Sequence, residues 1–156
     1  MAEPVFAPCV VIPVYNHEHA IGAVVDGIRA QGMPMVLVDD GSSAACAEVL
    51  QRLSATPDVM LVRHERNRGK GAAVGTGLRS AHERGYTHAV QIDADGQHTV
   101  SDVTRFIDEA RKYPDAVICG RPIFDASIPK LAALWSTAFG RASGYGQKIP
   151  PSPAAS

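Results

Sequence analysis

Two aspartates, Asp93 and Asp95, directly follow an apolar run at residues 89–92. Side chains two positions apart on an extended segment point to the same side, so both carboxylates are expected to face one point. A divalent cation relieves the repulsion between two such groups, and carboxylate oxygens suit the hard ions Mg²⁺ and Mn²⁺. Gly96 allows a sharp turn after the pair. The alternative is a solvated acidic turn at the end of a strand.

A second candidate segment, residues 67–73, places Arg68 and Lys70 among glycines at the predicted start of a helix. The free N–H groups of a helix start favour anions. Its glycine spacing misses the dinucleotide-binding fingerprint by one residue, and the P-loop pattern is absent. The alternative is a helix N-terminus that carries two solvated cations.

The apolar pattern predicts strands that alternate with helices. Continuous apolar runs predict buried strands at residues 9–12, 35–38, 59–62, 89–92 and 116–120. Apolar residues at helical spacing predict helices around residues 21–28, 46–53, 74–81, 103–110 and 131–138. Such alternation is typical of an α/β fold, in which helices cover both faces of a mostly parallel sheet.

The polar segments that follow three of these strands carry most of the side chains suited to chemistry. They are residues 13–18, 39–43 and 93–98. Ligands of parallel sheets bind beyond the carboxyl ends of the strands. We therefore expect these three segments to lie at one edge of the sheet.

Composition predicts one globular domain in a reducing compartment. The 156 residues are 46% hydrophobic and 20% charged, and the net charge of -1 argues against a nucleic-acid partner. Cys9, Cys46 and Cys119 are expected to be buried free thiols. The sequence shows neither a signal-peptide pattern nor a run of about 18 apolar residues, so we expect a cytoplasmic protein. We expect a domain at residues 1–140 and a disordered tail at residues 141–156.

Four motifs together resemble the family 2 glycosyltransferases. They are Val11-Ile12-Pro13-Val14-Tyr15-Asn16, Val38-Asp39-Asp40-Gly41-Ser42, Asn67-Arg68-Gly69-Lys70-Gly71 and Asp93-Ala94-Asp95-Gly96-Gln97-His98. They stand in the family's order between about Cys9 and Arg121, and the last is most similar to the dolichyl-phosphate mannose synthase branch. The resemblance implies the Rossmann-like GT-A fold and an inverting transfer from a nucleotide-diphospho-sugar.

The resemblance also implies a set of site residues. The substrate-binding set is Pro13, Tyr15, Asn16, Glu18, Asp39, Asp40, Lys70, Asp93, Ala94 and Arg121. Within it, Asp39 would accept a hydrogen bond from the base, Lys70 would lie near the nucleotide or diphosphate, and Arg121 would contact a phosphate. Asp93 and Asp95, the predicted catalytic residues, would hold Mg²⁺ or Mn²⁺, and Gln97 is a further candidate ligand.

Histidines are expected outside the metal site. Hard-ion sites favour oxygen, so His17, His64 and His98 are predicted to be surface or turn histidines.

The segment after Arg121 departs from the family's pattern. Asp125 is the only later acid, and neither a Glu-Asp base motif nor a Gln-x-x-Arg-Trp motif follows. We therefore expect an apparently truncated, donor-binding half of a transferase that binds donor but transfers sugar slowly or not at all. The acceptor would be a polyprenyl phosphate or a saccharide. The apolar residues Leu131, Leu134 and Trp135 would contact the inner face of a membrane or another copy of the chain.

Two other functions stay open. One is a non-catalytic nucleotide-sugar-binding module. The other is a nucleotidyltransferase, which would normally show a glycine-rich and basic loop directly after the first strand; residues 13–18 are not such a loop.

Overall fold

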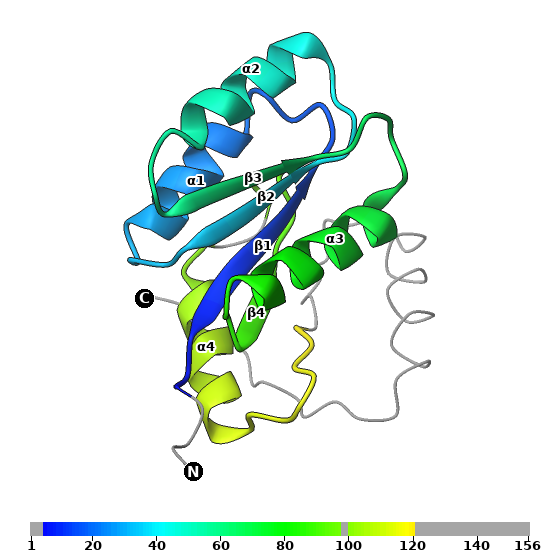
Figure 1. The fold of residues 1–156 in the computed structure, drawn as a ribbon. Helices are drawn as coiled ribbons and strands as arrows, with labels where there is room; N and C mark the ends of the chain where they lie inside the picture. Colours follow the sequence, from blue (N-terminus) through cyan, green and yellow to red (C-terminus); the bar gives the residue numbers. More distant parts are fainter. Residues whose placement is uncertain (1–4, 98–99, 121–156) are drawn as a thin grey trace, which may run out of the picture. The chain divides into compact units, whose positions relative to one another are not determined.

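The computed structural model describes residues 5–97 and 100–120. The elements, in chain order, are β1 (Pro8–Val14), α1 (Ile21–Arg29), β2 (Met35–Asp39), α2 (Ala44–Leu53), β3 (Val59–Arg63), α3 (Lys70–Glu83), β4 (His88–Gln91) and α4 (Asp102–Lys112). The four strands form one parallel sheet in the order β3-β2-β1-β4 (Figure 1). The predicted α/β class and parallel sheet are confirmed.

The chain divides into two compact units, residues 1–111 and 112–156, and the sheet lies entirely in the first. The predicted fifth strand at residues 116–120 is wrong, because the structure has no strand there. A short apolar run does not by itself define a strand, which needs the backbone of a neighbouring strand to pair with. The predicted helix at residues 131–138 and the predicted tail lie outside the described residues.

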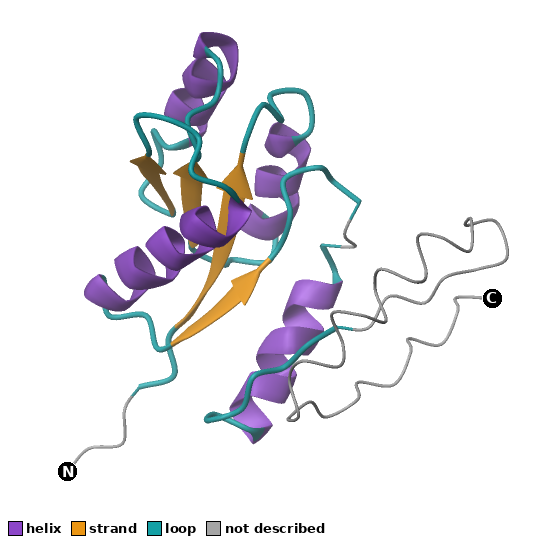
Figure 2. Cartoon of the chain, turned by 90° about the vertical axis from the view of Figure 1, so that its right-hand side faces the viewer, coloured by secondary structure: helices purple, strands orange, loops and turns teal. Residues whose placement is uncertain are grey.

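Helices cover both faces of the sheet (Figure 2), because each central strand is apolar on both sides. On one face, Val10 and Ile12 of β1 pack in a core that includes side chains of α1, α2 and α4. On the other face, Val11 of β1 and Val38 of β2 pack with residues of α3. Every residue of β2 is buried, which explains why its first four residues, 35–38, form a continuous apolar run.

Helix α3 lies unusually close to the sheet at Gly77. A methyl group at this position would overlap the side chain of Val11. The close approach brings the beginning of α3, at Lys70, near the ends of β1 and β4.

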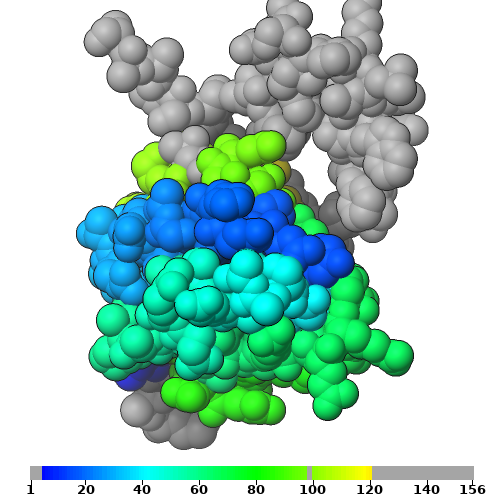
Figure 3. Space-filling model, turned by 90° about the horizontal axis from the view of Figure 1, so that it is seen from above, coloured from blue at the N-terminus to red at the C-terminus, as the bar shows by residue number. Residues whose placement is uncertain are grey.

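The carboxyl ends of the strands share one edge. Seen from this end in Figure 3, the blue residues after β1 lie directly against the cyan residues after β2. In the part of the chain that the structure describes, no helix is long and apolar enough to cross a membrane.

Candidate functional site

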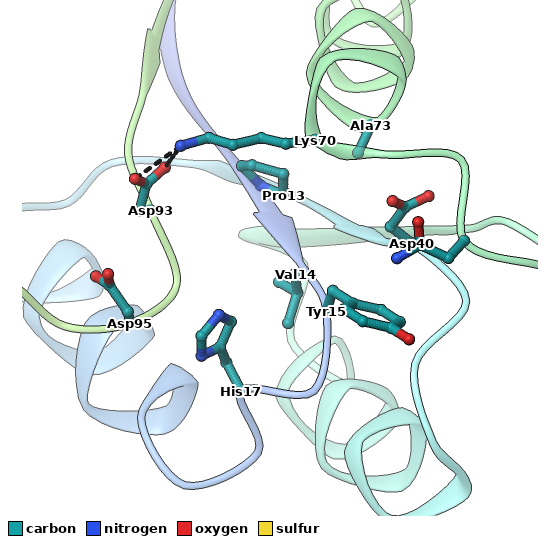
Figure 4. A pocket seen from close by; sticks show the side chains of 10 residues that line it. Pro13, Val14, Tyr15, His17, Asp40, Lys70, Ala73, Asp93 and Asp95 are labelled. Carbon is teal, nitrogen blue, oxygen red and sulfur yellow. Dashed lines mark hydrogen bonds and ion pairs between the residues drawn. The ribbon is translucent and has the colours of Figure 1, made fainter. Parts of the chain in front are cut away.

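A cavity of about 250 Å³ opens at the carboxyl edge of the sheet (Figure 4). It is lined by Pro13, Val14, Tyr15, His17, Asp40, Asn67, Lys70, Ala73, Asp93 and Asp95. These residues come from the end of β1, the end of β2, the start of α3 and the segment after β4. The expectation that three polar segments meet at one edge is confirmed, and the segment that begins α3 joins them.

One side of the cavity holds Lys70 and the two aspartates. Lys70 Nζ lies 2.6 Å from Asp93 Oδ1 and 2.8 Å from Asp93 Oδ2. Gln91 Nε2 donates to Asp93 Oδ1 at 2.8 Å. Figure 4 shows Lys70 extending from the start of α3 to Asp93, with Asp95 and His17 also facing the cavity.

Successive residues of the segment after β4 face the cavity and the core in turn. Asp93 and Asp95 line the cavity, whereas Ala94 is 2% exposed and packs in the hydrophobic core. The backbone N–H of Gln97 donates to Asp95 Oδ1 at 3.0 Å, and the exposed Gln97 does not line the cavity. The structure therefore brings the two predicted carboxylates together but not Ala94 or Gln97.

The donor set of this corner fits a hard divalent cation that keeps water or substrate ligands. Both candidate protein ligands are carboxylates, the groups that Mg²⁺ prefers. Among the described residues, no cluster of three or more His, Cys, Asp or Glu could hold a metal ion by itself. A cation bound here would thus take its remaining ligands from water or from the phosphates of a substrate, as Mg²⁺ commonly does.

The loop after β1 is held against the loop after β2. Asn16 has a positive φ of 55°, and its Oδ1 accepts a hydrogen bond from the Ser43 N–H at 2.8 Å. In return, the Asn16 N–H donates to Ser42 Oγ at 3.1 Å. Asn16 therefore shapes the loop, whereas its neighbour Tyr15, 48% exposed, lines the cavity. Glu18 does not line it, and its Oε2 is buried without a hydrogen-bond partner among the described residues.

The two adjacent aspartates at the end of β2 differ in their surroundings. Asp39 is fully buried, does not line the cavity and accepts a hydrogen bond from the Ser42 N–H at 2.8 Å. Its Oδ2 lies 3.2 Å from Arg63 Nε but has no well-oriented hydrogen bond within the described part of the chain. Asp40, by contrast, reaches the cavity wall.

Asp40 ties the segment before α3 to the end of β2. Its Oδ1 accepts hydrogen bonds from His64 Nδ1 at 2.7 Å and from the Arg68 N–H at 2.9 Å, and its Oδ2 accepts from the Gly69 N–H at 2.8 Å. Burial by itself raises the pKa of Asp40, but the hydrogen bonds from His64 and the two backbone N–H groups outweigh burial and lower its pKa. We therefore assign Nδ1 of His64 as the donor.

His64 extends this network to α3. Its Nε2 lies 2.9 Å from Thr76 Oγ1, so one imidazole joins β2, the segment before α3 and α3 itself. The prediction of a surface or turn histidine is wrong for His64, which is only 7% exposed. His17 is exposed and lines the cavity. Its place in the polar segment after β1 was the sequence signal that could have identified it as a site residue. The predicted residues Arg121 and His98 lie outside the described residues.

Two curated relatives carry names that describe lipid-phosphate sugar transferases. The chain is 33% identical over 121 residues to the UDP-N-acetylglucosamine–dolichyl-phosphate N-acetylglucosaminyltransferase of Methanococcus voltae, covering 66% of this chain and 48% of that protein. It is 31% identical over 116 residues to the polyprenol monophosphomannose synthase of Mycolicibacterium smegmatis, covering 72% of this chain and 44% of that protein. The chain thus spans less than half the length of these relatives.

Solved structures share the fold. The mannosyltransferase PcManGT from Pyrobaculum calidifontis, in complex with GDP-Man and Mn²⁺, superposes with a TM-score of 0.60 at 21% identity, over 78% of this chain and 37% of that one. S. aureus TarS 1-349 in complex with UDP gives a TM-score of 0.55 at 20% identity, over 79% and 38%. The architecture is therefore the GT-A fold of glycosyltransferases.

The sequence model described as "Glycosyl transferase family 2" matches residues 9–143, which include every residue that lines the cavity. The match covers most of the chain and agrees with the four motifs between Cys9 and His98. The chain belongs to glycosyl transferase family 2.

Proposed function

We propose that this chain binds a nucleotide-diphospho-sugar together with Mg²⁺ or Mn²⁺ and forms the donor site of an inverting transferase whose acceptor is a lipid phosphate. The observation that carries the proposal is the side of the cavity lined by Asp93 and Asp95, where Asp93 lies beside the ammonium of Lys70. This side of the cavity offers ligands for a cation and a positive charge for a diphosphate. The names of the relatives from Methanococcus voltae and Mycolicibacterium smegmatis favour a polyprenyl-type phosphate as acceptor.

Different residues around the cavity would contact different parts of the donor. Tyr15 presents an aromatic ring near the nucleoside end. Asp39, buried behind the cavity wall, has Arg63 as ionic partner of its Oδ2 but no hydrogen bond on that atom within the described part of the chain, which suits it to accept one from the base. Lys70 and the N-terminus of α3 favour the diphosphate, because free helix N–H groups and an ammonium both attract anions. Asp93 and Asp95 would hold the metal against the same phosphates.

The chemistry follows from where negative charge develops. Cleavage of the sugar–phosphate bond leaves charge on the departing nucleoside diphosphate, which Lys70 is placed to stabilise. The bound metal would add Lewis-acid stabilisation of that charge. Attack from the opposite face inverts the anomeric carbon, and a lipid phosphate is already an anion, so it needs no general base to activate it. We place such a protein on the cytoplasmic side of the membrane that carries its acceptor.

Calorimetry of nucleotide binding tests the donor site. Asp95→Asn should weaken Mn²⁺-dependent binding of a nucleoside diphosphate by at least about tenfold, because a charged interaction is worth about 1.5–3 kcal/mol. Binding of the bare nucleoside should be unchanged. Asp108→Asn, which removes the same charge from an exposed position of α4, is the matched control.

Two outcomes contradict the proposal. Equal losses for diphosphate and nucleoside in Asp95→Asn would show that this carboxylate does not act on the phosphates. Failure of the wild-type chain to bind any of a panel of nucleotide-diphospho-sugars with Mn²⁺ would show that the cavity is not a donor site. Transfer from a radiolabelled donor to polyprenyl phosphate then tests the acceptor.

A further inference from the structure

The carboxylate of Asp93 already has a cation as its partner. Lys70 Nζ contacts both of its oxygens, at 2.6 and 2.8 Å, and Gln91 Nε2 occupies Oδ1 from another direction at 2.8 Å. Figure 4 shows this pair spanning the cavity between α3 and the segment after β4. A divalent cation that binds Asp93 through the same oxygens must therefore compete with Lys70.

Lys70 is able to leave this position. Its side chain is 60% exposed, whereas that of Asp93 is 28% exposed, so solvent surrounds the lysine more than its partner. A lysine ammonium is a point charge on a flexible four-carbon stem. Lys70 is also the first residue of the 14-residue helix α3, where the helix N-terminus favours anions.

We propose that Lys70 is an exchangeable counter-cation of Asp93, which occupies the carboxylate in the absence of donor and transfers to the diphosphate when a divalent cation and the donor bind together. The inference rests on the proposed function and describes how that same site couples its two ligands. An ammonium and a divalent cation on the same two oxygens repel each other, so the metal alone binds weakly. The diphosphate gives Lys70 a new anionic partner, so donor and metal each strengthen the binding of the other.

Binding of Mn²⁺ in the absence of nucleotide, followed by the electron paramagnetic resonance signal of free Mn²⁺, tests the competition. Lys70→Met removes the charge and keeps most of the length. It should bind Mn²⁺ about two- to fivefold more tightly than the wild type, the range expected from losing a partly exposed ion pair. Lys70→Arg, which keeps a cation at this position, should resemble the wild type.

A charge control and a second measurement separate this effect from general electrostatics. Arg84→Met removes a positive charge at the other end of α3, about 21 Å away at 1.5 Å per residue, and should leave Mn²⁺ affinity unchanged. In the presence of Mn²⁺, Lys70→Met should bind a nucleoside diphosphate more weakly than the wild type, the opposite direction from its effect on the metal alone. Circular dichroism checks that each variant keeps its helices.

Equal or weaker Mn²⁺ affinity in Lys70→Met, or no measurable affinity in either protein, overturns the inference. So does tighter binding of the diphosphate by Lys70→Met, because Lys70 would then not move to the phosphates. Failure of the proposed function gives a different result: the wild-type chain itself would bind no nucleotide-diphospho-sugar with Mn²⁺.

Discussion

Replacing His64 by alanine should loosen the segment that presents Lys70 to the cavity. His64 is 7% exposed and contacts Asp40 Oδ1 at 2.7 Å and Thr76 Oγ1 at 2.9 Å. It therefore joins the end of β2 to α3 across the segment that leads into that helix. Removing the ring leaves the buried carboxylate with two backbone donors, the N–H groups of Arg68 and Gly69.

The magnitude follows from the two lost hydrogen bonds. A hydrogen bond to a charged group contributes about 1.5–3 kcal/mol and a neutral one about 0.5–1.5 kcal/mol. We therefore expect His64→Ala to lower the free energy of unfolding by about 2–4 kcal/mol. Asparagine has a side-chain N–H₂ that can donate to Asp40 but does not extend to Thr76, so His64→Asn should recover part of the loss.

Denaturant unfolding followed by circular dichroism measures this effect, with His82→Ala as control. His82 is exposed on the same helix, α3, and its replacement should change stability by less than about 0.5 kcal/mol. In calorimetry, His64→Ala should weaken binding of a nucleoside diphosphate more than binding of the bare nucleoside, because Lys70 follows the loosened segment. A loss below about 1 kcal/mol, or equal weakening of both ligands, would refute the assigned positioning role.

Three further predictions concern packing and ionisation. Gly77→Ala should destabilise the fold by about 1–3 kcal/mol because the methyl group overlaps Val11, whereas Gly75→Ala on the same helix should stabilise it by up to about 1 kcal/mol; thermal unfolding distinguishes the two signs. The expectation of three buried thiols is wrong for Cys119, which is exposed. Burial raises the pKa of Cys9 to about 11, so iodoacetamide at pH 8 should modify Cys119 and spare Cys9, as mass spectrometry of the native protein can show. The pKa of Asp40 is lowered in the folded state, so its ionised form stabilises the fold above the unfolded pKa of about 3.9, and this contribution is lost as the pH falls below that value. Asp40→Asn should therefore lose less stability between pH 5 and the acid limit than the wild type, as denaturant unfolding at a series of pH values can show.

The pattern of apolar and polar residues is sufficient to predict the class of the fold and the edge of the sheet at which the site lies. A strand covered by helices on both faces is mostly apolar on both sides, so the apolar runs in β1 and β2 indicated the centre of the sheet. Parallel strands bring their carboxyl ends together, so the polar segments after β1, β2 and β4 were expected at one edge. An apolar run was not a sufficient signal at residues 116–120, where the run is present but no strand forms.

The contacts of each polar side chain, by contrast, depend on how distant parts of the chain pack together. The neighbouring residues Asp39 and Asp40 have the same side chain. The backbone at the end of β2 places Asp39 in a fully buried position and Asp40 on the cavity wall. The partners of Asp40 lie 24 to 29 residues away, and Lys70 lies 23 residues from Asp93. No local pattern encodes such pairs, because they depend on how closely α3 packs on the sheet, and that distance is set by the absence of a side chain at Gly77.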